Sequence, residues 1–392
     1  MRILMISDVY FPRVNGVSTS IQTFRQAFEA RGHTVALIAP DYGQAADDGE
    51  DVLRIPSRQV LMDPEDFMMK RRSVGRLTDA LRERDFDLLH IQTPFVAHYA
   101  GTALARRLGI PRVETYHTFF QEYLYHYVPF LPKSWMREAA RKFSRWQCNA
   151  VDAVVVPSSA MLDVLREYGV RSPIEVIPTG LAAGRYEPGD GARFRTRYGI
   201  PSSRPTLVHV GRVAFEKNIG FLLQVLVRVR ATVPEVLLVI AGEGPALRQL
   251  QQQAADLGLQ EHVLFVGYLS RDTSLSDCYC AADAFVFASN TETQGLVLIE
   301  AMAQGVPVVS TAVRGTKDIL KPDCGALVAQ EDVEDFAAKV TTVLGDDALR
   351  GELAAQARSY AREWSDDAFA ERMLGFYRDV IHGAGACQES SA

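Results

Sequence analysis

The sequence AFVFASNTETQGLVLIEAMAQGVPVVS spans residues 284–310 and contains a strand, a loop, a helix and the start of a second strand. Residues 284–288 are a short apolar run, typical of a buried strand, and residues 289–294 form a polar loop. A helical run follows at 296–304, and Gly305 stands where a helix C-cap glycine belongs. This order predicts one unit of a parallel sheet, with its loop at the carboxyl end of a strand, where α/β sheets bind phosphates.

Two carboxylates lie in this stretch. Glu292 precedes the expected helix and Glu300 lies within it, eight residues later, so both can face the same side. Glu300 is flanked by apolar residues, and buried carboxylates rarely lack a partner. The alternative is a solvated glutamate on the outer stripe of the helix, and this stretch alone leaves both interpretations open.

Composition indicates a soluble globular chain of two ordinary domains, with 392 residues, 47% hydrophobic and 23% charged. The net charge of −6 gives no electrostatic reason to expect nucleic-acid binding. Residues 1–8 reach an acidic residue after a very short apolar run, which predicts a first strand and no signal peptide. No window approaches a transmembrane span, so any membrane contact is expected to be peripheral. Scattered cysteines without metal-ligand spacing predict reduced thiols in a cytoplasmic protein: Cys148, Cys278, Cys280, Cys324 and Cys387.

Strands and helices alternate along the whole chain, which predicts an α/β protein made of two doubly wound, Rossmann-like parallel-sheet domains that face a cleft. The N-terminal domain is expected at 1–180 and the C-terminal domain at 181–365, with a Pro-, Gly- and Arg-rich interdomain region at 178–204. A helix at 366–383 is expected to return to the N-terminal domain, and 384–392 to be a flexible tail. A helix at 18–30 is expected to follow the first loop.

Three further segments contain candidate phosphate-binding groups. Gly211 ends an expected strand, and Arg212 and Lys217 lie in the loop after it, where two cations can clamp a diphosphate. Residues 242–245, GEGP, form a Gly-rich turn after the next strand, and Asn15 and Gly16 precede the first helix. Each segment alone is weak evidence, because solvated loop cations or an ordinary turn would give the same pattern.

His117 after an N-terminal strand, the Gly211–Lys217 segment, the Gly-rich turn and the pair Glu292 and Glu300 occur in this order. Together with ETQGL at 292–296 and EAMA at 300–303, this resembles the retaining glycosyltransferases of family 4, which have the GT-B architecture. The resemblance covers nearly the whole chain and argues against a solvated Glu300. One departure is Asn15-Gly16, where many relatives carry Gly-Gly, which puts the geometry of the phosphate cap in doubt.

The resemblance implies roles for individual residues. Glu300 would bind the ribose hydroxyls of a nucleotide sugar, Arg212 and Lys217 its diphosphate, and Glu292 the sugar ring, with His117 near the anomeric centre. The catalytic set is then Glu292, His117, Arg212 and Lys217. The donor-binding set is Gly16, Arg212, Lys217, Gly244, Tyr268, Leu269, Thr293, Gln294, Gly295, Leu296 and Glu300. The family usually needs no metal or other cofactor, and none is expected here.

Residues 118–148 are unusually aromatic and basic, and we expect them to bind the acceptor. Lys133, Arg137, Arg141 and Arg145 recur every fourth residue, so they form one stripe of a helix, which suits an anionic membrane surface. The alternative is that the Met136 face packs on the domain core and the cations are simply solvated. The acceptor- and membrane-binding set is Phe119, Phe120, Tyr123, Trp135, Arg137, Arg141 and Arg145.

The opening residues 11–20 and the segment 117–129 resemble the lipid-glycosylating branch of the family, which includes monoglucosyldiacylglycerol synthases and phosphatidylinositol mannosyltransferases. The resemblance favours glucosyl transfer from UDP-glucose to diacylglycerol by a peripheral protein at the inner face of the cell membrane. GDP-mannose-dependent mannosyl transfer to a lipid or polysaccharide precursor is the alternative. A nucleotide-binding protein without transfer activity is a third reading, which the intact Glu292, Glu300, Arg212 and Lys217 disfavour.

Overall fold

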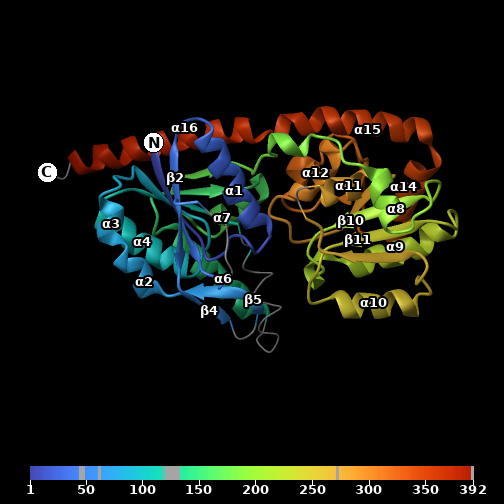
Figure 1. Cartoon of the computed structure of the whole chain (residues 1–392), viewed down its shortest axis with the longest axis horizontal. Coiled ribbons are helices and arrows are strands. Elements are labelled where there is room, and N and C mark those ends of the chain that lie inside the picture. Colours follow the sequence, from blue (N-terminus) through green and yellow to red (C-terminus); the bar gives the residue numbers. More distant parts are fainter. Residues whose placement is uncertain (44–48, 61–62, 118, 120–132, 271–272, 390–392) are drawn as a thin grey trace. The chain divides into compact units, whose positions relative to one another are not determined.

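The computed structural model describes residues 1–43, 49–60, 63–117, 119, 133–270 and 273–389. The chain divides into two compact units, Met1–Gly180 with Asp366–Ala392, and Leu181–Ser365. Each unit is built on a parallel sheet covered by helices (Figure 1). Among the described residues, no helix combines the length and the apolar character that crossing a membrane requires.

The sheet of the first unit has the strand order β3-β2-β1-β6-β7-β8-β9, and neighbouring strands pair in parallel. Its strands are β1 (Arg2–Ile6), β2 (Thr34–Pro40), β3 (Val52–Ile55), β6 (Leu88–Ile91), β7 (Arg112–Thr115), β8 (Ala153–Val156) and β9 (Ile174–Val176). A separate antiparallel hairpin consists of β4 (Ser57–Val60) and β5 (Asp63–Met69). The helices are α1 (Gly16–Glu29), α2 (Arg71–Arg76), α3 (Thr78–Arg82), α4 (Val96–Leu108), α6 (Lys133–Cys148), α7 (Ser159–Glu167) and α16 (Asp366–Glu389).

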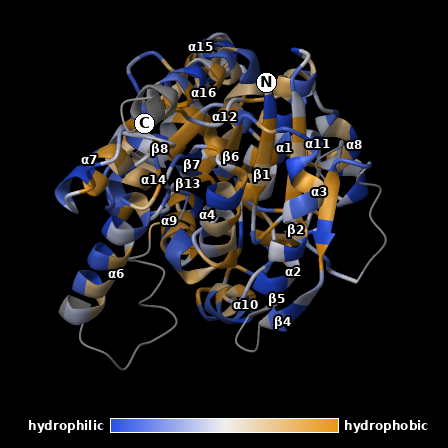
Figure 2. Ribbon diagram, turned by 90° about the vertical axis from the view of Figure 1, so that its left-hand side faces the viewer, coloured by the Kyte–Doolittle hydropathy of each residue, from blue (hydrophilic) through white to orange (hydrophobic). Residues whose placement is uncertain are grey.

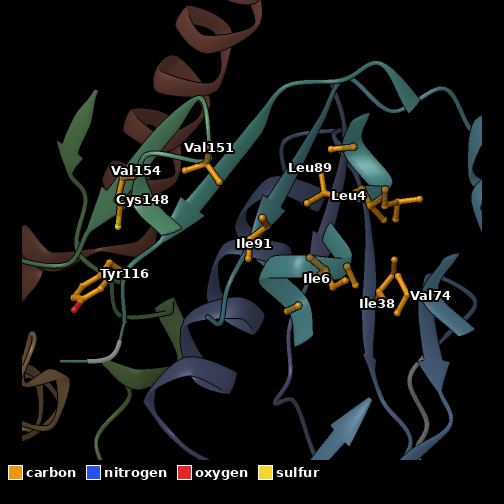
Figure 3. Close-up of a cluster of buried hydrophobic side chains, with 14 of the residues drawn as sticks. Leu4, Ile6, Ile38, Val74, Leu89, Ile91, Tyr116, Cys148, Val151 and Val154 are labelled. Carbon is orange, nitrogen blue, oxygen red and sulfur yellow. The ribbon is translucent and has the colours of Figure 1, made fainter. Parts of the chain in front are cut away.

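The core of the first unit lies around the central strands. Leu4, Ile6, Leu89 and Ile91 on β1 and β6 are fully buried, and Figure 3 shows them pointing into one cluster. Strands buried on both faces read as continuous apolar runs, which is why this sheet could be predicted from the sequence. Figure 2 shows the hydrophobic strands in orange, with blue hydrophilic residues on the surrounding helices.

Helix α1 begins at Gly16, two residues before the start predicted from the sequence. Asn15 is its N-cap, and its side-chain oxygen accepts a hydrogen bond from the Ser18 N–H at 2.9 Å. This bond satisfies one of the donors left unpaired at a helix start. Asn15 therefore has a structural reason to stand where many family members have glycine.

Helix α16 packs on the first unit, although it follows the second unit in sequence (Figure 1). Its buried residues Phe369, Ala370, Met373, Leu374 and Tyr377 share one face. The Tyr377 ring meets Phe28 of α1 with centroids 5.8 Å apart, and its hydroxyl lies 2.5 Å from His90 Nδ1 on β6. The helix continues through Glu389, so residues 384–389 are helical where a flexible tail was expected.

The second unit has the strand order β12-β11-β10-β13-β14-β15, again with parallel neighbours. Its strands are β10 (Thr206–Val210), β11 (Leu237–Ala241), β12 (Val263–Gly267), β13 (Ala284–Phe287), β14 (Val308–Thr311) and β15 (Ala326–Ala329). Its α-helices are α8 (Gly191–Arg197), α9 (Ile219–Arg230), α10 (Leu247–Asp256), α11 (Ser274–Cys280), α12 (Leu296–Ala303), α13 (Thr316–Ile319), α14 (Val333–Gly345) and α15 (Asp347–Ala361). Short 3-10 turns are η1 (Ala183–Arg185), η2 (Phe215–Lys217) and η3 (Arg362–Trp364).

The segment expected as an interdomain region belongs largely to the second unit. Helix α8 buries Phe194, and Arg193 makes two hydrogen bonds to the buried Asp277 carboxylate on α11, at 2.7 and 2.9 Å. Its many glycines and prolines suggested a linker. The aromatic anchor and the buried ion pair instead fix it against the domain.

We expect Tyr377→Ala to lower the free energy of unfolding of the first unit by about 3–5 kcal/mol, because it removes a fully buried aromatic ring. It also leaves His90 Nδ1 without its hydroxyl partner. The measurement is urea unfolding, followed by a probe in the first unit. Asp379→Ala, an exposed position on the same helix, is the control and should change stability by less than about 0.5 kcal/mol. Equal effects of the two substitutions would contradict this docking of α16.

Candidate active site

The strand order of the second sheet reverses between β10 and β13. From β10 the chain continues outward through β11 and β12, and from β13 it continues in the other direction through β14 and β15. Loops leaving two neighbouring strands in opposite directions open a crevice at their carboxyl ends, which is where α/β sheets bind ligands. The residues predicted to hold a diphosphate follow β10, and those predicted to hold the sugar follow β13.

A buried histidine fixes these two strands beside one another. His209 on β10 donates its Nδ1–H to the Val286 carbonyl on β13 at 3.1 Å, and its ring stacks on Phe287 at 5.5 Å between centroids. Burial is the main reason that its pKa falls to about 4, so the ring is neutral at pH 7. The His209 contact supports the β10–β13 pairing from within the core.

Lys217 and Glu292 meet in the loops that follow β10 and β13. The Lys217 ammonium donates a hydrogen bond to Glu292 Oε1, and the two side chains are 20% and 16% exposed. Lys217 ends the short turn η2 after β10, and Glu292 lies in the loop after β13. The structure thus brings together two residues predicted for the site that are 75 positions apart in the sequence.

The Gly-rich turn after β11 supports the loop that holds Arg212. Val213 N–H donates to the Glu243 carbonyl at 2.8 Å, and Ala246 N–H donates to the Val213 carbonyl at 3.0 Å. A Cβ at Gly242 would lie 1.9 Å from the Gly211 carbonyl oxygen, and one at Gly244 would lie 2.4 Å from that of Val213. Only glycine allows this close approach of two backbones. The structure therefore shows a packing role for Gly244, which was predicted to bind the donor.

Glu300 is 3% exposed and accepts a hydrogen bond from the Tyr279 hydroxyl at 3.0 Å. The alternative of a solvated Glu300 is therefore wrong. Tyr279 on α11 was not identified from the sequence, because nothing in the local pattern connects it with a carboxylate 21 residues later.

Gly315, which was not identified from the sequence, packs against the loop of residues 292–295 and supports it. Gly315 N–H donates to the Glu292 carbonyl at 3.1 Å, and a Cβ there would lie 2.1 Å from the Thr293 carbonyl oxygen. Gly295 has φ of 97° and is the N-cap of α12, which begins at Leu296, so the amides of residues 293–296 lie at a helix start, as predicted. Such amides suit phosphate and hydroxyl oxygens.

Two residues predicted for the nucleobase pocket follow the edge strand β12. Tyr268 is 51% exposed and Leu269 is 7% exposed. The strand order β12-β11-β10 places these two residues two strands away from the loop that contains Lys217.

The first unit has its own reversal of strand order, between β1 and β6. His117 follows β7, and its Nε2 lies 3.3 Å from the side-chain oxygen of Gln92, which follows β6. Burial lowers the His117 pKa to about 4, so this imidazole is neutral at pH 7. Gly16 begins α1, and a Cβ there would meet no atom within 4 Å.

Asp8 is a candidate that sequence reasoning missed. It follows β1 and accepts hydrogen bonds from Thr93 Oγ1 at 2.8 Å and from Ala97 N–H at 3.1 Å. Burial raises its pKa to about 6, and these hydrogen bonds only partly oppose the effect of burial. A carboxyl with a perturbed pKa at a strand-order reversal is typical of functional sites. The signal was an acidic residue directly after the first apolar strand.

Helix α6 has two different faces. Met136 and Ala140 are buried in the core, which agrees with the alternative that this face packs on the domain. On the other face, Trp135 is 74% exposed, and Arg137 and Arg145 are exposed as well. Arg141 is partly exposed and donates to the Glu167 carbonyl at 3.2 Å.

Phe119 is 5% exposed and packs in the core of the first unit, so its assignment to a membrane-contacting surface is corrected. An aromatic residue in an aromatic-rich segment can serve either purpose, and here its burial decides. Phe120 and Tyr123 lie outside the described residues.

Comparison with known proteins shows which family the chain belongs to. The model of the glycosyl transferases group 1 matches residues 191–364, and the model of glycosyltransferase family 4 matches residues 14–185. The alpha-monoglucosyldiacylglycerol synthase of Streptococcus pneumoniae is 32% identical, over 97% of this chain and 86% of that protein. The chain belongs to glycosyltransferase family 4.

A second relative of this family 4 glycosyltransferase is the GDP-mannose-dependent alpha-mannosyltransferase of Corynebacterium glutamicum, 29% identical over 97% of this chain and 89% of that protein. Two solved structures share the fold. HepE of Anabaena, in complex with UDP and glucose, has a TM-score of 0.78 and 17% identity, over 97% of this chain and 100% of that chain. Sucrose-phosphate synthase of Thermosynechococcus elongatus has a TM-score of 0.78 and 22% identity, over 97% of this chain and 99% of that chain. The chain is therefore a hexosyltransferase of the GT-B fold.

Gly242→Ala should lower the stability of the second unit by about 1–3 kcal/mol and weaken nucleotide binding, because the new Cβ pushes the Gly211 backbone away. Thermal unfolding and calorimetric titration with a nucleoside diphosphate measure the two effects. Gly351→Ala is the control, since that glycine lies in α15 with open space around it. A Gly242→Ala protein with normal stability and normal binding would show that the close approach is not required.

Proposed function

We propose that this glycosyltransferase moves a hexose from a nucleotide diphosphate sugar to a membrane lipid, with retention of anomeric configuration. The favoured donor is UDP-glucose and the favoured acceptor is diacylglycerol. The observation that carries donor use is the meeting of Lys217 and Glu292 at the reversal of the second sheet, in a unit that also buries Glu300.

The Lys217–Glu292 ion pair suggests how a donor would be bound. Without ligand, the carboxylate neutralises the ammonium; a diphosphate brings more negative charge and competes for it. Lys217 and Arg212 would then stabilise the charge on the leaving nucleotide, as preorganised donors do in many transfer reactions. Glu292, released from Lys217, would be available to the sugar hydroxyls and to the positive charge that develops on the ring.

The buried Glu300 suits the ribose. A carboxylate can accept hydrogen bonds from both hydroxyls of a diol, and Tyr279 orients one of its oxygens. Tyr268 and Leu269 would line the nucleobase. Front-face attack, with the leaving phosphate accepting the proton of the acceptor, would need no covalent nucleophile and no metal.

Residues of the first unit would act near the anomeric centre, on the donor phosphates and on the acceptor. Neutral His117 and partly buried Asp8 lie at the carboxyl ends of its central strands, and Gly16 begins the helix after β1. The membrane acceptor is supported by the exposed face of α6, on which Trp135 and Arg137 are open to solvent. Interfacial tryptophan and basic residues favour the surface of an anionic membrane. We therefore place the protein at the inner face of the cell membrane, as a peripheral protein.

The alternative is a GDP-mannose-dependent alpha-mannosyltransferase that acts on a lipid or polysaccharide precursor. Several similar proteins carry that activity in their names, including the one from Corynebacterium glutamicum. Both versions use the same site, and they differ in the nucleobase, the sugar and the acceptor.

The test is a screen of sugar nucleotides with vesicles that contain diacylglycerol, with lipid product and free nucleotide measured in parallel and repeated in the presence of a chelator. We expect transfer from UDP-glucose to diacylglycerol that chelation leaves unchanged. Transfer from GDP-mannose alone would establish the alternative. Donor hydrolysis without any lipid product would refute the lipid acceptor, and dependence on added metal would refute the metal-free mechanism.

Lys217→Ala and Glu300→Gln should each raise the donor KM or lower kcat/KM about 10- to 150-fold, because each removes one charge-assisted contact. Lys321→Ala and Glu261→Gln, which are exposed in the same unit, make the same changes of charge and should leave the kinetics unchanged. Donor kinetics are measured at saturating acceptor. Variants of the site and of the surface that behave alike would remove the basis for this site.

A further inference from the structure

A basic cavity that is open to solvent lies at the end of α6, away from the residues assigned to catalysis. Its volume is about 660 Å³, and it is lined by Arg145, Asn149, Gly169, Arg171 and Ser172. Asn149 and Ser172 precede β8 and β9, so the cavity lies at the amino end of these strands. His117 follows the carboxyl end of the neighbouring strand β7, at the opposite edge of the sheet.

The backbone around the cavity is held in place by hydrogen bonds. Asn149 Oδ1 accepts from the backbone N–H groups of Arg171 at 2.7 Å and Ser172 at 3.4 Å, and Ser172 Oγ donates to the Val151 carbonyl at 3.0 Å. Because the Asn149 oxygen is used in this way, its NH₂ group is the part that can donate to a ligand. The position of this amide is therefore set by the fold.

The side chains at the cavity are donors that lack an anionic partner. Among the described residues, neither the Arg145 guanidinium nor the Arg171 guanidinium forms an ion pair with a carboxylate. The stem of Arg145 passes over Gly169, where a Cβ would lie 3.5 Å from Arg145 Cδ. Two guanidinium forks and one amide, with no carboxylate in the lining, match the oxygen atoms of a phosphate group.

We propose that this cavity binds a phosphate group, and that its source is the headgroup of an anionic phospholipid. The phosphate chemistry follows from the donors alone. The lipid source rests on the function proposed above and on the neighbouring Trp146, which is 56% exposed on the same last turn of α6 as Arg145. Trp146 would lie among the headgroups while the cavity holds one of them, which fixes how the first unit rests on the membrane.

The experiment uses the full chain and the double variant Arg145→Gln/Arg171→Gln. Binding to phosphatidylcholine vesicles is measured with and without phosphatidylglycerol, and calorimetry measures the binding of inorganic phosphate at constant ionic strength. The control is Arg106→Gln/Arg107→Gln, which removes the same charge from exposed positions in the last turn of α4. A third variant, Arg145→Lys/Arg171→Lys, keeps the charge but loses the planar forks.

We expect the glutamine variant to lose about tenfold or more of its affinity for phosphatidylglycerol vesicles, the lysine variant to recover only part of it, and the control to bind normally. Phosphate binding that the glutamine variant loses, without any vesicle effect, would assign the site to free phosphate. The proposal is overturned if the glutamine variant equals the control in both measurements, or if the lysine variant equals the unmodified chain. These experiments measure binding and not sugar transfer. A protein that binds phosphate in this cavity but transfers nothing to diacylglycerol would therefore refute the proposed function and leave the phosphate site intact.

Discussion

The adjacency of β10 and β13 is the constraint on which the candidate site depends. The chain places these strands side by side although they are far apart in the sequence, and it then continues in opposite directions from them. His209 ties the pair together from inside through its bond to the Val286 carbonyl. Since the strands are parallel, the loops that follow them leave at the same edge. Lys217 and Glu292 lie in these two loops, and they form an ion pair at this edge.

The surrounding backbone shows how closely this edge is packed. Glycines at 242 and 244 let the loop after β11 lie directly against the loop that holds Arg212, and Gly315 supports the loop that holds Glu292. Rigid support matters because a cationic site helps transfer most when its donors need no rearrangement as charge develops. The glycines at 242 and 244, whose pattern resembles a phosphate-binding turn, thus also have an indirect role: they support the residues that would contact the ligand.

The parts of the fold that could be predicted are those with a strong local pattern. Buried parallel strands such as Leu88–Ile91 and Leu237–Ala241 are continuous apolar runs, and the order of strands and helices follows from them. The burial of Glu300 could be suspected from its apolar neighbours. Helices α2 and α3, the β4–β5 hairpin and α15 were not identified, because short or polar elements on a surface lack such a pattern.

Contacts between segments that are distant in the chain could not be predicted from the sequence. Asp8 is held by Thr93 and Ala97, and Tyr279 by Glu300, and no spacing rule links such positions. The same limit explains Phe119, whose aromatic neighbours suggested a surface while its own ring is buried. The function of the chain rests on the site, because the same fold supports many activities.

The most direct test of the account is a crystal structure with a nucleoside diphosphate sugar bound. We predict that the Lys217 ammonium leaves Glu292 and contacts a phosphate oxygen, that Glu300 accepts hydrogen bonds from the ribose hydroxyls, and that Glu292 turns toward the sugar. A donor bound elsewhere, with the Lys217–Glu292 pair intact, would contradict the assignment of this crevice as the donor site.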